Sequence, residues 1–176
     1  MARPLAERLH LTIESLETPI GVLRIVTDAV GALCAVGWLD LEERLQRDLD
    51  RQYGACGFSL AAGRVTSGVS RSIRRYFEGE LSAIDALSVE TGGTAFQREV
   101  WGALRAIPCG TTVTYAELAT RMGRPAAVRA VGAANGANPV GVVVPCHRVI
   151  GADGSLTGYG GGLERKAWLL RHEGAR

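Results

Sequence analysis

The sequence has no apolar run that could cross a lipid bilayer. Apolar stretches such as Val140 to Pro145 fall far short of the roughly 20 residues that a membrane-spanning helix needs. The opening residues, Met1 to Arg8, contain basic residues but no apolar core behind them, so they do not form a secretory signal. We therefore expect a protein without membrane contact and with a cytoplasmic location.

Clustered metal ligands are also missing. The four cysteines, Cys34, Cys56, Cys109 and Cys146, form no C-x-x-C pair, and the chain has only three histidines. A structural zinc site needs ligands close together, so we predict no metal and no other cofactor. The glycine-rich run 158–162 lacks the Gly-Lys-Ser/Thr ending of a phosphate loop. It is better explained as a loop whose backbone a neighbouring group or ligand can approach closely.

The remaining composition is that of an ordinary globular protein. The chain has 176 residues, of which 47% are hydrophobic and 22% charged, with a net charge of +2. Residues 1–90 carry 10 basic and 13 acidic side chains (−3), whereas residues 91–176 carry 10 and 5 (+5). A basic second half suggests an anionic partner such as nucleic acid, although a solvated arginine-rich surface explains the charge equally well.

The first half alternates between strand and helix patterns. Short β-branched runs punctuated by turn residues predict three strands within residues 9–38. Apolar residues every four positions predict a helix over 40–53, and a second helix is expected over 67–77, from Ser67 to Phe77. Residues 54–63 show no regular pattern. The polar segment 87–93 is typical of a linker, so we predict an N-terminal domain over 1–90 and a second domain over 91–176, in an α/β (α+β) chain.

The second half is expected to be mainly helical. Thr94-x-x-Gln97 and Thr114-x-x-Glu117 have the form of capping boxes that begin helices. A third helix is expected over 126–135 and a last one over 163–172. Between them we predict an apolar strand over 140–144 and a hairpin turn over 151–154.

Two short helices before these strands resemble a helix-turn-helix with a wing, a DNA-binding unit. The second helix carries one long polar side chain, Arg129, among alanines and glycines. A major-groove reader normally presents several such side chains, so this helix fits close approach and insertion of Arg129 better. A buried helix packed tightly on a neighbour is the alternative.

The most informative segment for chemistry is Pro145-Cys146-His147. The proline stiffens the chain where the predicted strand delivers a thiol and an imidazole. Neighbouring side chains on a strand point in opposite directions, so His147 could act on Cys146 only at a bend or through a water. Glu173 on the last helix could orient His147 in a relay of the Cys–His–Glu type. A buried structural cysteine is the competing explanation.

Several segments together resemble one family. The matching segments are Phe96-Gln97-Arg98-Glu99-Val100-Trp101, Ile107-Pro108-Cys109-Gly110, Thr114-Tyr115-Ala116-Glu117-Leu118, Arg129-Ala130-Val131-Gly132, Asn138-Pro139, Pro145-Cys146-His147-Arg148-Val149, Gly158-Tyr159-Gly160-Gly161-Gly162 and Lys166-x-Trp168-Leu169-Leu170-x-x-Glu173. In this order they resemble the O(6)-alkylguanine-DNA alkyltransferases, most closely the bacterial Ogt type. The resemblance is nearly complete from about residue 90 onward and looser before it.

The resemblance implies both a fold and a reaction. It implies a small ribonuclease H-like sheet-and-helix domain followed by an all-helical, winged helix-turn-helix domain. A monomer would transfer an alkyl group from guanine O6, and less efficiently from thymine O4, in double-stranded DNA to its own cysteine, once per molecule. The implied catalytic residues are Cys146 as acceptor, with His147, Glu173 and Asn138.

The resemblance also implies contacts with DNA and with the extruded base. The DNA-binding residues would be Arg129, Tyr115, Ala116, Arg124, Gln97 and Ala152, and the substrate pocket would be formed by Tyr115, Val149, Tyr159, Gly160 and Gly161. Family members often carry serine at the position of Gly160. Its absence predicts a larger pocket here.

Three other functions compete with this one. An alkyltransferase-like protein binds alkylated DNA without repairing it, but such proteins carry another residue at the position of Cys146. A winged-helix transcription factor needs more base-reading side chains than the helix with Arg129 offers. A cysteine hydrolase needs an oxyanion hole and repeated turnover. Some larger relatives carry an additional zinc-cysteine domain. This sequence has neither the room nor the ligand spacing for such a domain.

Overall fold

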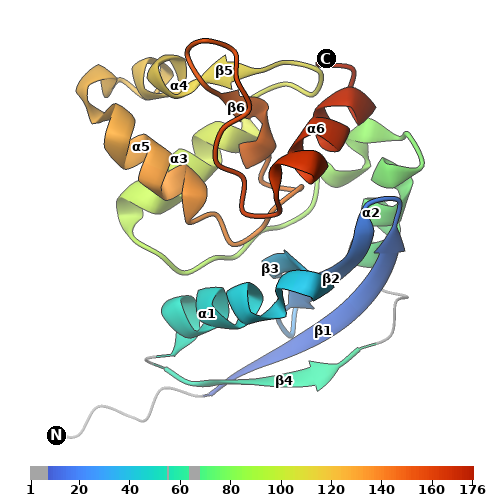
Figure 1. Cartoon of the computed structure of the whole chain (residues 1–176). Helices are drawn as coiled ribbons and strands as arrows, with labels where there is room; N and C mark the ends of the chain where they lie inside the picture. The colour runs from blue at the N-terminus through green and yellow to red at the C-terminus, as the bar shows by residue number, and fades with distance from the viewer. Residues whose placement is uncertain (1–7, 55, 64–67) are drawn as a thin grey trace, which may run out of the picture.

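The chain is a mixed α/β protein. The computed structural model describes residues 8–54, 56–63 and 68–176. Figure 1 shows a twisted sheet with α1 beside it in the lower part of the molecule and helices α3 to α6 gathered above it. Residues 1–7 of the opening segment, and Ser67 as the expected first residue of a helix, lie outside the described residues.

The sheet has the strand order β3-β2-β1-β4. Its strands are β1 (Leu9–Thr18), β2 (Gly21–Thr27), β3 (Leu33–Trp38) and β4 (Phe58–Ala62). The three strands predicted within 9–38 are confirmed, and they pair antiparallel in sequence order. The assignment of 54–63 as irregular is wrong, because β4 pairs parallel with β1 there. As a mostly exposed edge strand, β4 lacks the alternation of apolar and polar residues that marks a half-buried strand.

Two helices complete the first half. They are α1 (Glu42–Tyr53) and α2 (Gly68–Phe77), with short 3-10 turns at Leu39–Leu41 and Leu81–Ile84. Leu45, Leu49 and Tyr53 on α1 pack against the sheet. This spacing of four residues places them on one face of the helix.

The second half contains α3 (Ala95–Arg105), α4 (Tyr115–Arg121), α5 (Val128–Gly136) and α6 (Leu163–His172). Both capping boxes are confirmed, since the threonine and the Gln or Glu three residues later exchange hydrogen bonds in each. Pro125 begins the 3-10 turn Pro125–Ala127, which leads directly into α5. The helices α4 and α5 pack on each other as a pair (Figure 1).

The predicted strand over 140–144 is wrong. Val140 forms a single bridge, and turns follow it. Val142 has φ 72°, and the N–H of Val143 donates to the carbonyl of Gly141, which makes a tight γ-turn. A second γ-turn surrounds Pro145, where the N–H of Cys146 donates to the carbonyl of Val144 at 2.8 Å. A positive φ is a strained conformation for a β-branched residue, so local strand propensity is overridden here.

The hairpin predicted around 151–154 is also wrong. Gly151 and Ser155 close a turn, but residues 151–162 contain no strand. Instead β6 (Val149–Ile150) pairs parallel with β5 (Val113–Thr114). The residues that follow form a long loop up to α6 (Figure 1).

The outer edge of β3, which no other strand of the sheet covers, joins the two halves of the chain. Leu33 exchanges backbone hydrogen bonds with Ser88 and Glu90 in the connecting segment, and the N–H of Val36 donates to Pro139 at 2.8 Å. Covering an open strand edge in this way satisfies its backbone groups. The turn that precedes Cys146 is therefore anchored to the sheet.

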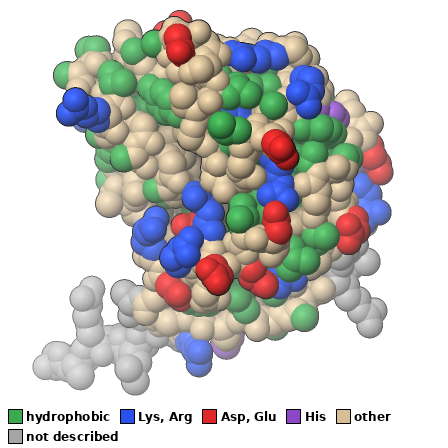
Figure 2. Space-filling model, in the orientation of Figure 1, with side chains coloured by type: hydrophobic (Ala, Val, Ile, Leu, Met, Phe, Trp, Pro, Cys, Tyr) green, Lys and Arg blue, Asp and Glu red, His purple; other side chains and the backbone are tan. Residues whose placement is uncertain are grey.

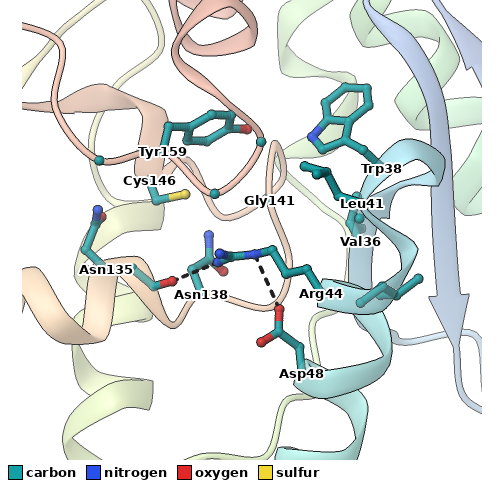
Figure 3. Close-up of a pocket in the computed structure, with 16 residues that line it drawn as sticks. Val36, Trp38, Leu41, Arg44, Asp48, Asn135, Asn138, Gly141, Cys146 and Tyr159 are labelled. Atoms are coloured by element: carbon teal, nitrogen blue, oxygen red, sulfur yellow. Dashed lines mark hydrogen bonds and ion pairs between the residues drawn. The ribbon is translucent and has the colours of Figure 1, made fainter.

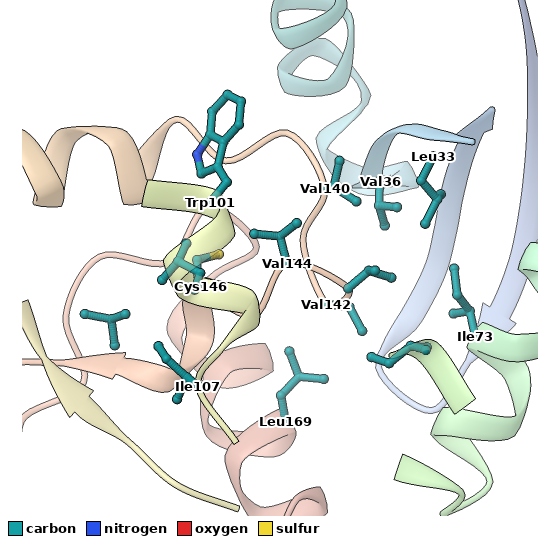
Figure 4. Close-up of a cluster of buried hydrophobic side chains, with 14 of the residues drawn as sticks. Leu33, Val36, Ile73, Trp101, Ile107, Val140, Val142, Val144, Cys146 and Leu169 are labelled. Atoms are coloured by element: carbon teal, nitrogen blue, oxygen red, sulfur yellow. The ribbon is translucent and has the colours of Figure 1, made fainter. Parts of the chain in front are cut away.

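One hydrophobic core extends across the connection. Figure 4 shows Val140 and Val142 between Leu33 and Val36 of the sheet and Trp101 of α3. The segment before Cys146 is thus packed on both sides. Within residues 8–54, 56–63 and 68–176, none of the helices combines the length and the apolar character needed to cross a membrane.

Candidate active site around Cys146

Cys146 opens a 3-10 turn, Cys146–Arg148, that follows directly on the second γ-turn. Figure 3 shows its thiol directed into a pocket between α1 and the loop that contains Tyr159. The residues that line the pocket are Val36, Gly37, Trp38, Leu41, Arg44, Leu45, Asp48, Asn135, Gly136, Asn138, Gly141, Cys146, Gly158, Tyr159, Gly160 and Gly161. Burial raises the pKa of the Cys146 thiol, whereas a hydrogen bond with Asn138 and the charges of Lys166 and Arg44 act to lower it.

His147 is fully buried beside Cys146 and forms a pair with Glu173. Its Nε2 lies 2.9 Å from Oε1 of Glu173. Because a carboxylate can only accept, Nε2 carries the proton and Nδ1 presents a lone pair. Nδ1 is buried and has no hydrogen-bond partner among the described residues. Burial lowers the pKa of His147, an effect that the Glu173 hydrogen bond opposes. The resting imidazole is therefore neutral and can accept a proton at Nδ1.

Glu173 accepts hydrogen bonds from three side chains. Arg148 donates through Nε and Nη2, each at 2.9 Å, and Tyr76 Oη donates to Oε1 at 2.7 Å. Burial alone would raise the pKa of Glu173, but the hydrogen bonds from His147 and Arg148 bring it well below its usual range. The carboxylate therefore stays ionised, and its position is fixed from several directions.

Asn138 closes the turn that holds Cys146. Its Nδ2 donates to the carbonyl of Val144 at 2.8 Å, and its Oδ1 accepts from the N–H of Val140 at 3.0 Å. Both bonds are buried, so the side chain replaces backbone partners that a regular strand would have supplied. The positive φ of Val142 is maintained by this clamp.

The far wall of the pocket is the loop 157–162. Lys166 is buried and holds this loop to β6, since its Nζ donates to the carbonyls of Val149 at 2.6 Å and Thr157 at 2.7 Å. Burial lowers the pKa of Lys166 to about 8. Tyr159 reaches the pocket, and a Cβ on Gly161 would lie 2.6 Å from Nε1 of Trp38. Glycine is therefore required where this loop meets the first half of the chain.

The expectation of a larger pocket at Gly160 does not fit the structure. A Cβ on Gly160 would lie 2.5 Å from Cζ and Nη2 of Arg44. The guanidinium of Arg44, from α1, thus fills the space that a side chain at position 160 would use. Sequence reasoning missed this because Arg44 and Gly160 belong to different halves of the chain.

The residues predicted to contact DNA lie on α3, α4, α5, the connection between α4 and α5, and the 151–154 turn. Arg129 is exposed on α5 and makes no hydrogen bond or ion pair with any part of the chain that the structure describes. Its helix packs on α3 and α4 through one face, with Val131, Ala134 and Asn135 buried, and leaves Arg129 on the exposed side. Figure 2 shows basic atoms on the surface at the upper left, in the region where Figure 1 draws the connection between α4 and α5.

The other residues predicted to contact DNA differ in exposure and in whether their polar groups already have partners within the chain. Ala116 is exposed in the first turn of α4, and Ala152 is exposed in the 151–154 turn. Gln97 is occupied as a capping residue, because its Oε1 accepts from the N–H of Thr94 at 2.9 Å. The guanidinium of Arg124 pairs with Glu99 at 2.9 Å, and its backbone N–H donates to Ala119. A phosphate contact through that N–H would have to displace this bond.

Sequence reasoning assigned no role to four side chains of this site. They are Tyr76 and Arg148 on Glu173, Lys166 behind the loop, and Arg44 in the pocket. Arg148 and Lys166 stood in the matching segments, but nothing local marked them as buried charges. Among the described residues, no group of three or more His, Cys, Asp or Glu side chains is arranged to hold a metal ion.

Comparisons with known proteins agree with this arrangement. Residues 95–175 match the family model of the 6-O-methylguanine DNA methyltransferase DNA-binding domain. A methylated-DNA–protein-cysteine methyltransferase of Shigella flexneri is 52% identical over 166 residues, which cover 94% of this chain and 97% of that protein. The crystal structure of the Mycobacterium tuberculosis O6-methylguanine methyltransferase has a TM-score of 0.75 at 37% identity and covers 94% of both chains. The structure of M. tuberculosis OGT in complex with DNA has a TM-score of 0.74 at 38% identity, over 94% of this chain and 93% of that one. With this identity over nearly its whole length, the chain belongs to the methylated-DNA–protein-cysteine methyltransferase family.

Proposed function

We propose that the protein repairs DNA by transferring the alkyl group of an O(6)-alkylguanine to Cys146, and that it also accepts O(4)-alkylthymine. The single observation that carries this proposal is that the Cys146 thiol points into a pocket and that the next residue, His147, forms a buried pair with Glu173. Because a thioether is stable, each molecule reacts once.

The proposed chemistry needs only groups of this chain. His147 takes the thiol proton through a water at Nδ1, and the Glu173 carboxylate stabilises the imidazolium that forms. The thiolate then attacks the alkyl carbon, a C–S bond forms and the bond between carbon and O6 breaks. The electron pair stays on guanine, and Tyr115 donates a proton to its ring. Asn138 keeps the turn in place, so that sulfur and carbon are aligned.

The damaged base has to leave the duplex to reach Cys146. Base extrusion costs a few kcal/mol, and we propose that Arg129 offsets this cost by entering the stack from the minor groove. Its exposed position on a helix of small residues supports this role. Tyr115, Val149, Tyr159, Gly160 and Gly161 are proposed to hold the extruded base, and Ala116, Arg124, Gln97 and Ala152 to lie along the DNA backbone.

We also propose the division into domains 1–90 and 91–176. Support comes from the irregular segment 87–93 and from the family match, which lies entirely within the second part. The first domain is proposed to be of the ribonuclease H-like type and to buttress the second. The helix pair α4 and α5 is proposed to act as a helix-turn-helix whose wing is the loop after β6. A monomeric state and a cytoplasmic location stay predictions of the sequence.

The proposal is tested by intact mass measurement and peptide mapping after mixing with excess duplex that contains one O(6)-methylguanine. We expect one added methyl group per molecule, located on Cys146. Tight binding to the lesion without an adduct would instead make the protein a damage sensor. More than one equivalent of repaired guanine per molecule would indicate turnover and contradict self-inactivation.

Arg129→Ala should slow the repair of duplex DNA by about tenfold or more, because the alanine no longer offsets part of the free-energy cost of base extrusion. Reaction with the free alkylated base should change little, because no stack has to be filled. Second-order rate constants with both substrates measure the difference. Arg171→Ala, an exposed change on α6, is the control. Equal losses on duplex and free base would contradict the insertion role.

A further inference from the structure

The charged wall of the pocket has been given no role so far in the recognition of the transferred group. Among the described residues, the ionisable side chains that line this pocket besides Cys146 and Tyr159 are Arg44 and Asp48, and both come from α1 in the first half of the chain. Figure 3 shows the Arg44 side chain extended from α1 toward Asn138 and the Cys146 thiol. The guanidinium therefore lies in the same pocket as the Cys146 thiol.

Two contacts hold the guanidinium in this position. Arg44 Nη2 donates to the carbonyl of Gly136 at 2.9 Å, and Nε lies 3.7 Å from Oδ2 of Asp48, one turn further along the helix. The Asp48 contact is too long for a strong hydrogen bond. The Nη1 group makes no hydrogen bond with the residues that the structure describes, so donors remain for a further anionic partner.

The position opposite Arg44 is a glycine, and a side chain there would require the guanidinium to shift. Any side chain at position 160 would begin 2.5 Å from the guanidinium. In this pocket the guanidinium of Arg44, from α1, therefore takes the place of a small side chain on the loop. This exchange adds positive charge and removes free volume beside the acceptor thiol.

We propose that Arg44 determines which O6 substituents this pocket accepts, favouring small groups that end in an anion, such as carboxymethyl, over bulky neutral groups such as benzyl. This inference rests on the proposed alkyl transfer to Cys146. A terminal carboxylate one carbon beyond the reacting methylene would meet the Nη1 and Nη2 donors of Arg44, and charge-assisted hydrogen bonds of this kind are the strong ones. An aromatic ring would have to displace the guanidinium.

The bonds that form and break are the same as in the transfer of a methyl group. The thiolate sulfur bonds to the methylene carbon, the bond between that carbon and O6 breaks, and its electron pair remains on guanine, which takes up one proton. The carboxylate is carried over unchanged to give S-carboxymethylcysteine at position 146. Arg44 binds the transferred group throughout and exchanges no proton.

The experiment compares three duplexes that contain O(6)-methylguanine, O(6)-carboxymethylguanine or O(6)-benzylguanine. Rates of adduct formation on Cys146 are measured by intact mass for the unaltered protein and for Arg44→Met, Arg44→Ala and Arg47→Ala. Each rate is divided by the methyl rate of the same variant, so that the fraction of folded protein and the reactivity of the thiol cancel. Arg47→Ala is the matched control, since Arg47 is exposed on the same helix and does not line the pocket.

The two substitutions at position 44 separate charge from size. Arg44→Met keeps most of the length but loses the charge, so the carboxymethyl-to-methyl ratio should fall by about tenfold to a hundredfold, as for loss of a charged hydrogen bond. Arg44→Ala loses both, so its benzyl-to-methyl ratio should in addition rise by about tenfold or more. Arg47→Ala should keep both ratios of the unaltered protein.

The outcomes distinguish this inference from the proposed function. If the unaltered protein gives a methyl adduct, but both ratios are the same in all four proteins, the role of Arg44 is overturned and alkyl transfer stands. Failure of the unaltered protein to accept the carboxymethyl group would overturn the role of Arg44 as well. No adduct from any duplex would overturn the proposed function and this inference together.

Discussion

Cys146→Ser should abolish alkyl transfer while leaving the affinity for duplex DNA within about twofold. A hydroxyl has a far higher pKa than a thiol, so almost none of it ionises at neutral pH, and oxygen is a weaker nucleophile than sulfur toward an alkyl carbon. The residues proposed above to face DNA lie on α3, α4, α5, the connection between α4 and α5, and the 151–154 turn, and they are unaffected. Transfer is measured by intact mass, and affinity by fluorescence anisotropy with labelled duplex.

The control for this prediction is Cys34→Ser. Cys34 is also a buried thiol, and burial raises its pKa to about 11, but it lies on β3 and outside the pocket. We expect this variant to accept one methyl group per molecule at an unchanged rate. Either variant buries a hydroxyl and should lose about 1 to 3 kcal/mol of unfolding free energy. Stoichiometric methylation of Cys146→Ser would exclude Cys146 as the acceptor.

The capping boxes could be predicted from sequence because they are local. Thr94 and Gln97, like Thr114 and Glu117, satisfy each other's backbone groups within one helical turn, so four residues contain the whole interaction. The same holds for the apolar spacing of α1. Such patterns describe elements whose stability depends on near neighbours in the chain.

The turn before Cys146 could not be predicted in this way. Five residues, Val140 to Val144, include four valines, whose propensity favours a strand, but Asn138 bonds at both ends of this segment and Val142 takes a positive φ. The packing of the segment between the sheet and α3 outweighs its local preference. Strain of this kind gathers at functional sites, and here it sets the direction of the thiol.

The site residues that sequence reasoning missed share one cause. Tyr76 reaches Glu173 across 97 positions, and Arg44 reaches Gly136 across 92. No period or short motif encodes contacts over such separations. The first half, for which the sequence suggested no chemistry, therefore supplies a hydrogen bond to the relay and a wall to the pocket.

Glu173→Gln should have the second largest effect, on both stability and rate. The amide cannot neutralise Arg148, so a buried guanidinium is left without its counterion, which costs about 3 to 5 kcal/mol of unfolding free energy. Loss of the carboxylate also removes the group that stabilises the His147 imidazolium. The alkylation rate at neutral pH should fall by about a hundredfold or more.

The pH dependence separates these two effects. The pKa of Glu173 is lowered in the folded state from an ordinary value of 4.5, so its stabilisation is complete above that value and declines as the pH falls below it. The gap in unfolding free energy between the two proteins should therefore narrow below about pH 4.5. The rate of the variant should instead rise steeply toward alkaline pH, where hydroxide can deprotonate the thiol without a base.

Tyr76→Phe is the matched control for Glu173→Gln. It removes one hydrogen bond to the same carboxylate but leaves its charge, Arg148 and His147 in place. We expect a loss of about 1 kcal/mol in unfolding free energy and a pH–rate profile of unchanged shape. Denaturant unfolding and single-turnover rates at several pH values measure both quantities. If Glu173→Gln lowered stability but kept the rate and pH profile of the unaltered protein, Glu173 would be a structural counterion of Arg148 and not part of the relay to Cys146.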